Sequence, residues 1–214
     1  NDSRGFIQVG QNRQSKIFSV GEEAAIFPCV MAWAATLLKQ DGHEVLWFDG
    51  QIEQSWEKLK DFQPDLILWE AKTPSIKPTW EAIRTVKDWW PACTVILCGD
   101  HVTALPQESL ENSPTDYIIT GGDYDKAIRA LCRELRTRPV SSHIYNYGTQ
   151  DFLADLSPID RNLCQWRDYG KMGNYLYLPG THGYSARDCW WRHEGGCTFC
   201  SWTNTFKNYR QLSV

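Results

Sequence analysis

Apolar residues follow two alternating patterns over the first 136 residues of the chain. Short, nearly continuous apolar runs are typical of strands that are covered on both faces. Between them, apolar residues return every three or four positions, as they do on one face of a helix. The short runs predict strands over 43–48, 66–69, 93–98 and 116–120. The longer stretches predict helices over 22–40, 51–62, 78–90, 104–111 and 124–136.

Proline, glycine and threonine refine some of these boundaries. We expect the first helix to begin near Pro28, because proline is tolerated in a first turn. Asp41-Gly42 predicts its end, since glycine favours the left-handed backbone that closes helices. Thr103 is expected to cap the helix over 104–111.

Strands that alternate with helices of this length build β-α-β units around a parallel sheet. The expected fold class is therefore α/β, with a flavodoxin-like (Rossmann-like) parallel sheet of strand order 2-1-3-4-5. Its first strand would lie before Asn1. Ligands of such sheets bind at the carboxyl ends of the strands, which here are 49–50, 69–72, 99–101 and 121–123. The ends at 99–101 and 121–123 carry glycine beside a polar residue, which allows close approach of a ligand to the backbone.

The pattern changes after residue 136. Prolines and glycines interrupt 137–173, which we interpret as a linker with short helices over 150–156 and 159–169. A strand is predicted over 174–178, and a cysteine-rich loop follows it. In a β/α barrel the first strand delivers a site loop in this way. We expect an α/β domain over 1–136 and the start of a barrel over 174–214.

Composition narrows the class of protein. With 42% hydrophobic residues and a mean hydropathy of −0.47, the chain is expected to be soluble and globular. No apolar run approaches the ~20 residues of a membrane span, and no secretory signal is visible. A net charge of −4 without a basic stripe argues against a nucleic-acid partner. Cysteines scattered through apolar stretches fit a reducing cytoplasm, and Cys29, Cys93, Cys98 and Cys132 are predicted to be small buried hydrophobic residues.

The loop over 187–202 carries the strongest chemical signal. Cys189, Cys197 and Cys200 have the spacing C-x7-C-x2-C, with two glycines before the second cysteine. Three thiolates can hold a 4Fe-4S cluster and leave one iron open to a substrate. With His193 as a fourth ligand they can instead hold a structural zinc. The spacing alone also allows a third interpretation, three buried or disulfide-bonded cysteines.

Three stretches at the ends of predicted strands carry a family resemblance: 99–106 (GDHVTALP), 120–124 (TGGDY) and 187–200, with its Arg-Asp-Cys start and CTFC end. The first is similar to a Gly-Gly-x-His-x-Thr-x-x-Pro sequence and the second to Gly-Glu-Gly-Glu. In their order and spacing they resemble the cobalamin-binding radical S-adenosylmethionine (SAM) family. This family includes the anaerobic magnesium-protoporphyrin ester cyclases and many methyltransferases. The resemblance covers nearly the whole chain.

The resemblance implies a cobalamin-dependent radical SAM enzyme. Cys189, Cys197 and Cys200 would hold a 4Fe-4S cluster that reductively cleaves SAM to start methyl transfer or cyclisation, and Phe199 would pack near the adenine of SAM. Cobalamin would lie over the strand ends of the first domain. Its candidate contacts are Gly99, His101, Thr103, Gly121, Gly122 and Asp123. The implied partners are a small-molecule substrate and an electron donor such as ferredoxin or flavodoxin.

The chain departs from the family in two places. The family's cysteine spacing is C-x3-C-x2-C, so the first gap here is four residues longer. An Asp-x-His-x-x-Gly sequence is absent, which favours cobalamin bound without a histidine below cobalt, and His101 is not assigned as a cobalt ligand. Arg187 and Asp188 are expected to position the loop or to contact SAM. Asp49 and Glu70 are interpreted as caps or loop residues without chemistry.

Two other functions remain open. The chain could be a non-catalytic flavodoxin-like binding module with a structural zinc held by Cys189, His193, Cys197 and Cys200. It could also be inactive by itself if its first strand and most of the barrel lie elsewhere.

Overall fold

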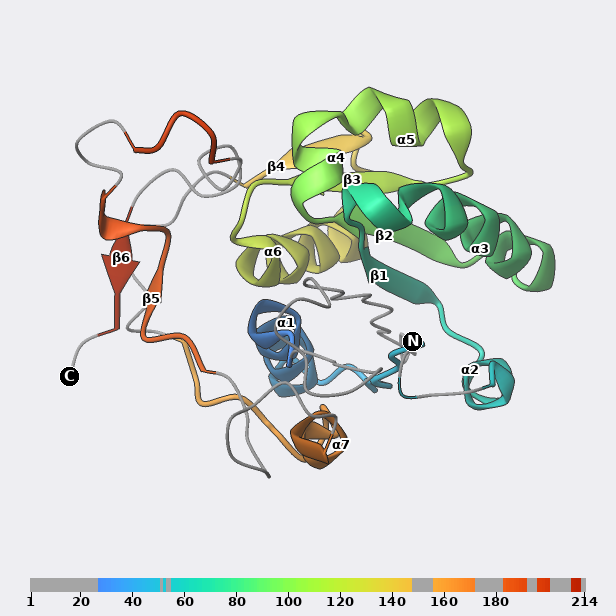
Figure 1. Cartoon of the computed structure of the whole chain (residues 1–214). Coiled ribbons are helices and arrows are strands. Elements are labelled where there is room, and N and C mark those ends of the chain that lie inside the picture. Colours follow the sequence, from blue (N-terminus) through green and yellow to red (C-terminus); the bar gives the residue numbers. More distant parts are fainter. Residues whose placement is uncertain are drawn as a thin grey trace.

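The computed structural model describes residues 27–50, 52, 55–147, 156–171, 183–191, 196–200 and 209–212. In this part of the chain, four parallel strands form a sheet of order β1-β2-β3-β4 (Figure 1). The strands are β1 (Leu66–Glu70), β2 (Thr94–Cys98), β3 (Tyr117–Thr120) and β4 (Ile144–Asn146). The first three are those expected from the apolar runs, in the expected neighbouring order. The α/β fold class is therefore confirmed.

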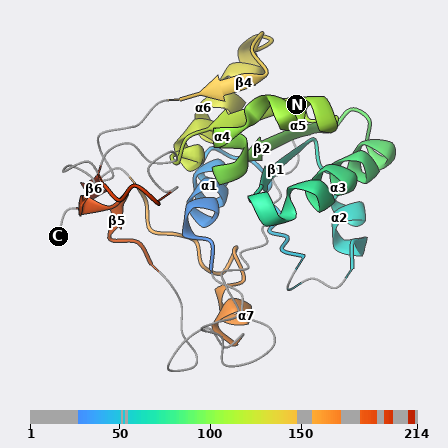
Figure 2. The same ribbon diagram turned by 45° about the horizontal axis from the view of Figure 1, so that its top comes forward.

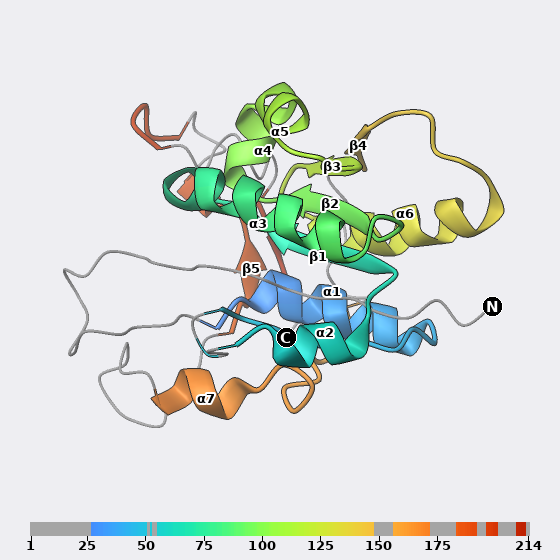
Figure 3. The same cartoon turned by 90° about the vertical axis from the view of Figure 1, so that its right-hand side faces the viewer.

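Helices cover both faces of the sheet, as Figures 1 and 3 show. One face carries α1 (Cys29–Gln40) and α6 (Tyr124–Thr137), and the other carries α3 (Ile76–Trp89), α4 (Asp100–Ala104) and α5 (Pro106–Asn112). The remaining helices are α2 (Glu57–Phe62), the short 3-10 helix η1 (Thr73–Ser75) and α7 (Trp166–Lys171). None of the helices in the described ranges has the length and hydropathy of a membrane span.

The alternation of side chains along the strands explains the two cores. Leu68 of β1 and Ile96 of β2 face α1 and α6, whereas Ile67 and Val95 face α3. All four are fully buried. Successive side chains of a strand point to opposite faces, so a continuous apolar run is needed wherever helices cover both sides.

The first helix begins and ends as predicted. Pro28 precedes α1, and the chain closes at Asp41 and Gly42, whose φ of +86° lies in the left-handed region. Almost every residue of α1 is buried, because the helix lies between α6 and the segment 156–171. Its burial on all sides explains why it contains few charged residues.

The prediction of a strand over 43–48 is wrong for the described residues. This segment is extended, but in the described residues only Glu44 forms a β-bridge. Trp47 and Phe48 are nevertheless buried, one in each core. An apolar run signals burial, and burial by side chains does not require a neighbouring strand.

Three further differences concern helices. Thr103 lies inside α4 and caps nothing, because α4 and α5 are separate helices joined at Leu105. The helix expected over 51–62 starts at Glu57, and the one expected over 159–169 is a turn followed by α7.

The edge strand β4 was not predicted from the sequence, and it lies within the stretch interpreted as a linker. It pairs in parallel with β3, from Ile118 opposite Ile144 to Thr120 opposite Asn146. Two half-exposed residues and one exposed residue give too short a signal to be recognised. The predicted strand over 174–178 lies outside the described residues, as does nearly all of the helix predicted over 150–156.

Candidate functional site at the carboxyl edge of the sheet

The eight cysteines fall into two groups by burial. Five are buried in the α/β domain and the segment that packs on it: Cys29, Cys93, Cys98, Cys132 and Cys164. Burial raises the pKa of Cys29 to about 11 and of Cys93 and Cys132 to about 12. These thiols stay protonated at neutral pH, as expected for small hydrophobic residues. In contrast, Cys189 and Cys197 are exposed and Cys200 is half-buried.

A short two-stranded sheet closes the loop that carries these three cysteines. In it, β5 (Ala186–Arg187) pairs in antiparallel fashion with β6 (Arg210–Gln211), with Arg187 opposite Arg210. The Leu212 amide adds a hydrogen bond of 2.8 Å to the Ser185 carbonyl. Figures 1 and 2 show this pair beside α1, apart from the four-stranded sheet. Cys189 follows β5 after a single residue, so it lies at the base of the loop.

The other two cysteines share a turn. The Cys200 amide donates to the Cys197 carbonyl at 3.1 Å. Gly196, with φ of +69°, allows the chain to enter this turn. The C-x2-C spacing thus brings two of the three predicted ligands together.

The third ligand is not brought to them in this structure. Within the described ranges, no three His, Cys, Asp or Glu side chains gather as a metal site. His193, the fourth ligand of the zinc interpretation, lies outside those ranges. The donor set still fits an iron–sulfur cluster, because three accessible thiols on one closed loop are the ligands that such a cluster needs. Cluster ligation by Cys189, Cys197 and Cys200 stays a prediction.

Aromatic side chains on the loop are exposed. Phe199, the predicted SAM contact, is 88% exposed. Trp190 and Trp191 are 57% and 49% exposed and pack edge to face, with ring centroids 5.3 Å apart. A role for Phe199 beside adenine requires a partner surface that the described residues do not provide, so it also stays a prediction.

Gly99, predicted as a cobalamin contact, ends β2 and precedes α4. Its φ is +111°, and a Cβ at this position would lie 2.6 Å from the Ala71 carbonyl oxygen. The Ala71 amide in turn donates to the Cys98 carbonyl at 2.8 Å. Glycine is therefore required here by the close approach of the chain that follows β1.

The side chain of Thr103 joins two of the predicted ligand loops. Its hydroxyl donates to the Gly99 carbonyl at 2.7 Å and accepts from the Gly121 amide at 3.0 Å. Gly121 has φ of +93° and leads into Gly122, which is buried. Both hydrogen-bonding functions of the hydroxyl are used within the domain.

His101 is buried on the α3 side of the domain. Its Nδ1 lies 3.2 Å from the Thr73 hydroxyl, and its ring packs edge to face against Trp80. Its Nε2 lies 3.3 Å from a carboxylate oxygen of Glu108, in a geometry that makes no hydrogen bond. The ring therefore lies between η1, which it contacts at Thr73, and α5, which it approaches at Glu108.

A polar cluster at the same edge was not anticipated from the sequence. Tyr124 donates to Oε1 of Glu70 at 2.9 Å, and Lys72 lies 3.6 Å from the same oxygen and 3.6 Å from Asp100. Burial raises the pKa of Tyr124, so the hydroxyl remains a donor. Burial alone would lower the pKa of Lys72, but the charges of Glu70 and Asp100 raise it. These four residues are brought together by two strand ends and the start of α6, which no local sequence pattern reveals.

Asp123 lies at the start of α6 and binds two arginines. One carboxylate oxygen accepts from Arg187 at 2.6 Å, and the other accepts from Arg210 at 2.6 Å. Asp125 also binds Arg187, with oxygen–nitrogen distances of 2.9 and 2.5 Å. All four side chains are buried. We call these four residues the arginine–aspartate cluster.

The charges in this cluster compensate one another. Burial alone would raise the pKa of Asp123, but hydrogen bonds from Arg210 and Arg187 hold it below its ordinary value. Burial would likewise lower the pKa of Arg187, and the charge and hydrogen bonds of Asp125 outweigh that effect. Two guanidinium groups thus face two carboxylates. Asp125 and Arg210 were not singled out in the sequence, because ion pairs 62 and 87 residues apart leave no local pattern.

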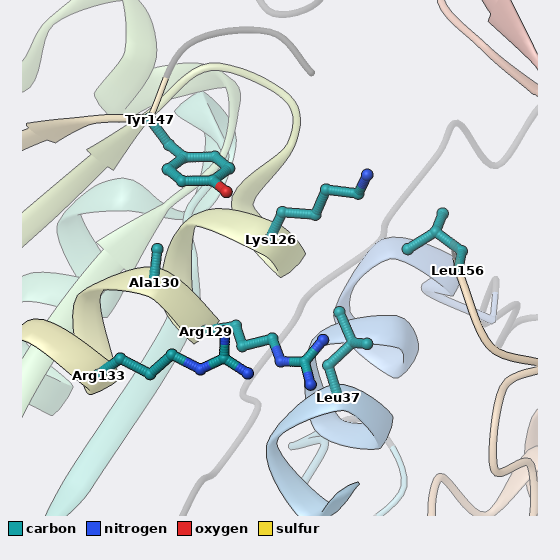
Figure 4. A pocket seen from close by; sticks show the side chains of 7 residues that line it. All are labelled: Leu37, Lys126, Arg129, Ala130, Arg133, Tyr147 and Leu156. Atoms are coloured by element: carbon teal, nitrogen blue, oxygen red, sulfur yellow. The ribbon is translucent and has the colours of Figure 1, made fainter. Parts of the chain in front are cut away.

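A separate hollow lies between α1 and α6, with a volume of about 160 Å³ (Figure 4). Its lining residues are Leu37, Lys126, Arg129, Ala130, Arg133, Tyr147 and Leu156. Arg129 is bound through two nitrogens to Asp41, at 2.8 and 2.6 Å, and Arg133 reaches the same carboxylate at 3.1 Å. Two of its cationic side chains thus already have an anionic partner.

The Asp41 ion pair predicts an acid-sensitive contribution to folding. Hydrogen bonds from Arg129 lower the pKa of Asp41 to about 2. Its stabilising effect is complete above the unfolded-state pKa of about 3.9 and is lost as the pH falls toward 2. We expect Asp41→Asn to lower the free energy of unfolding by on the order of 1 kcal/mol at pH 7, with the difference from wild type shrinking as the pH falls through about 2 and disappearing below it. Urea unfolding followed by circular dichroism over this pH range measures it, and a pH-independent difference would contradict it.

With this geometry established, the fold can be compared with solved structures. It matches the structure of the radical SAM methyltransferase TsrM from Kitasatospora setae, solved with tryptophan substrate and a SAM analogue, with a TM-score of 0.52. The match covers 65% of this chain and 27% of that one at 14% identity, so it shows the fold. The N-terminal domain of a hypothetical protein from Thermotoga maritima matches with a TM-score of 0.40 and 20% identity over 54% of this chain and 88% of that one. The chain thus has the α/β fold found in a radical SAM enzyme.

The sequence points to one particular relative. The chain is 25% identical over 206 residues to the anaerobic magnesium-protoporphyrin IX monomethyl ester cyclase of Cereibacter sphaeroides. This match covers 84% of the chain, and the chain spans 32% of the length of the cyclase. No family model matches the chain. The resemblance to the cobalamin-binding radical SAM family that the motifs predicted is confirmed.

Proposed function

We propose that this protein is a radical SAM enzyme in which Cys189, Cys197 and Cys200 hold a 4Fe-4S cluster. The observation that carries the proposal is the division of the cysteines. Five thiols are buried in packed cores, whereas three lie on one loop whose ends are joined by β5 and β6. The similarity to a cyclase and the fold shared with a methyltransferase support the same class of chemistry.

The residues of this chain would bind and place the cluster. Cys189, Cys197 and Cys200 would hold the cluster, and when bound it would supply the electron for reductive cleavage of SAM. The turn over 197–200 fixes two ligands relative to each other, and β5 fixes the start of the chain that leads to the third. Phe199 lies within this turn, and its exposed ring is available to stack on adenine.

Cobalamin enters this proposal only through the resemblance and the fold. The side chains of Thr103 and Asp123, two of its predicted contacts, have their hydrogen-bonding atoms engaged inside the domain, and His101 is buried against Trp80. The side chains of these three residues do not fit a cobalamin site, so we assign cobalamin no step. The proposed substrate is a small molecule and the proposed electron donor is a ferredoxin or flavodoxin. The relatives include both a cyclase and a methyltransferase, and either reaction fits the proposal.

Anaerobic reconstitution of the intact protein with iron and sulfide tests the cluster. We expect a brown protein with about four irons and four sulfides per chain. Cys197→Ser should lose most of the iron, because it removes one of three ligands. Cys132→Ala, which removes a buried thiol of the α/β domain, is the matched control and should keep it.

A colourless wild-type protein that binds one zinc would contradict the cluster and favour the binding-module interpretation. In that event His193→Ala should release the zinc, because a structural zinc site needs four ligands.

A further inference from the structure

The arginine–aspartate cluster joins the α/β domain to both ends of the cysteine loop. Arg187 belongs to β5 and Arg210 to β6, and the two face each other in the register of that pair. Both side chains reach across to the start of α6, where they meet at Asp123. Asp125, two residues further along and in the first turn of α6, adds two more bonds to Arg187.

We propose that Asp123 and Asp125 are positioning residues that hold the cysteine loop against the carboxyl edge of the sheet. The proposal deepens the proposed function and rests on it, since it concerns how the loop that would bind the cluster is placed. The residues act through the two arginines and touch no cofactor themselves. In this role Asp123 is a structural residue that joins α6 to β5 and β6.

The geometry of the bonds supports a positioning role. An arginine bound by two parallel hydrogen bonds is fixed in orientation as well as in place, because the guanidinium group is planar. Arg187 has such bonds to Asp125, and Arg210 bonds both oxygens of Asp123. A buried ion pair is a poor source of stability compared with packed apolar residues of similar size. Its specific effect is to select one arrangement of the segments that it joins.

The arginine–aspartate cluster lies close in sequence both to the first cysteine of the loop and to the end of β3. Arg187 lies two residues before Cys189, so little chain separates the fixed guanidinium from the first thiol. Asp123 directly follows Gly121-Gly122, at the end of β3 where parallel sheets bind ligands. The cluster therefore holds the first cysteine of the loop close to the edge of the sheet.

Helix α1 also contacts Arg187. The guanidinium carbon of Arg187 lies 5.2 Å from the ring centroid of Trp33, on α1. The Trp33 indole nitrogen donates to the Ser157 carbonyl at 3.0 Å, and the ring of Tyr184 lies 6.4 Å away. The start of the cysteine loop is thus held by α1 as well as by α6.

Hydrogen exchange in the intact protein tests the proposal without requiring a bound cluster. The double variant Asp123→Asn with Arg210→Met removes one negative and one positive charge. The remaining buried charges, Arg187 and Asp125, still bind each other. We expect the amides of 186–187 and 210–212 to exchange about tenfold faster or more, while the amides of β1, β2 and β3 keep their protection. The variant with Asp125→Asn and Arg187→Met added should show the larger effect.

Reconstitution with iron and sulfide gives the second measurement. We expect both variants to bind less iron than wild type and their cluster to be lost faster on dilution, because the start of the loop that leads to Cys189 is no longer fixed by Arg187. Asp41→Asn is the matched control, since it removes a carboxylate from another arginine pair of the same domain and leaves 183–212 untouched.

Unchanged protection of 186–187 and 210–212 in both variants, with the sheet intact, would overturn the positioning role. Loss of protection throughout the sheet would overturn it as well, because the cluster would then serve global folding. If wild type bound no iron but the variants still released the loop, the proposed cluster would fail while the positioning of the loop would stand.

Discussion

Replacing Arg187 by Met is expected to lower the free energy of unfolding by about 3–5 kcal/mol, the usual cost of removing one partner of a buried ion pair. The substitution keeps much of the apolar volume of the side chain, so the loss is electrostatic. It removes both hydrogen bonds from Arg187 to the fully buried carboxylate of Asp125, and it also removes the Arg187 bond to Asp123. Urea unfolding followed by tryptophan fluorescence measures the change.

A second variant, in which the unpaired carboxylate is also removed, distinguishes the effect of charge on stability from that of packing. Adding Asp125→Leu to Arg187→Met removes the carboxylate as well, and we expect it to recover most of the lost stability, because apolar replacements of buried ion pairs are often neutral. Equal destabilisation by the single and the double variant would show that shape, and not charge balance, decides the stability of this cluster.

Gly99→Ala is expected to destabilise the protein by about 2–4 kcal/mol, from backbone strain and overpacking together. With φ of +111°, Gly99 has a backbone conformation that side chains disfavour, and the added Cβ would lie 2.6 Å from the Ala71 carbonyl oxygen. That oxygen belongs to the backbone that continues β1, so relief requires movement of the strand end. Chemical denaturation of the variant measures the loss.

Gly42→Ala is the control for this prediction. Gly42 also has a positive φ, +86°, but a Cβ there would meet nothing within 4 Å. Strain alone should cost about 1 kcal/mol. If the two alanine variants lost equal stability, the contact between the added Cβ and the Ala71 carbonyl oxygen would contribute nothing to the loss at Gly99.

The fold could be predicted where one local signal determined the structure. The strands around Leu68 and Ile96 are covered on both faces, and such strands show as unbroken apolar runs. The limits of α1 followed from Pro28 and Gly42, whose backbone preferences act locally. The segment 43–48 gave the same apolar signal, but in the described residues it forms only a single bridge at Glu44, and Trp47 and Phe48 are buried by side-chain packing.

The candidate site was predictable only in part, for the same reason. The three cysteines of the loop are marked by their spacing, and the structure separates them from the buried five. The roles of Asp123 and Thr103 depended on partners far along the chain. Asp123 binds arginines 64 and 87 residues away, and the Thr103 hydroxyl meets an amide 18 residues away. A motif identifies which residues are unusual, but tertiary contacts decide what they bind.

The closed base of the cysteine loop has a consequence for how much its length can vary. Because β5 and β6 set the distance between the two ends, residues added between Cys189 and Cys197 enlarge the loop without displacing the domain beneath it. Doubling the length of a flexible loop costs only about 0.6 kcal/mol in closure entropy. The seven-residue gap of this chain therefore costs little free energy, and insertions at this point would change the size of the loop while its paired base stays the same.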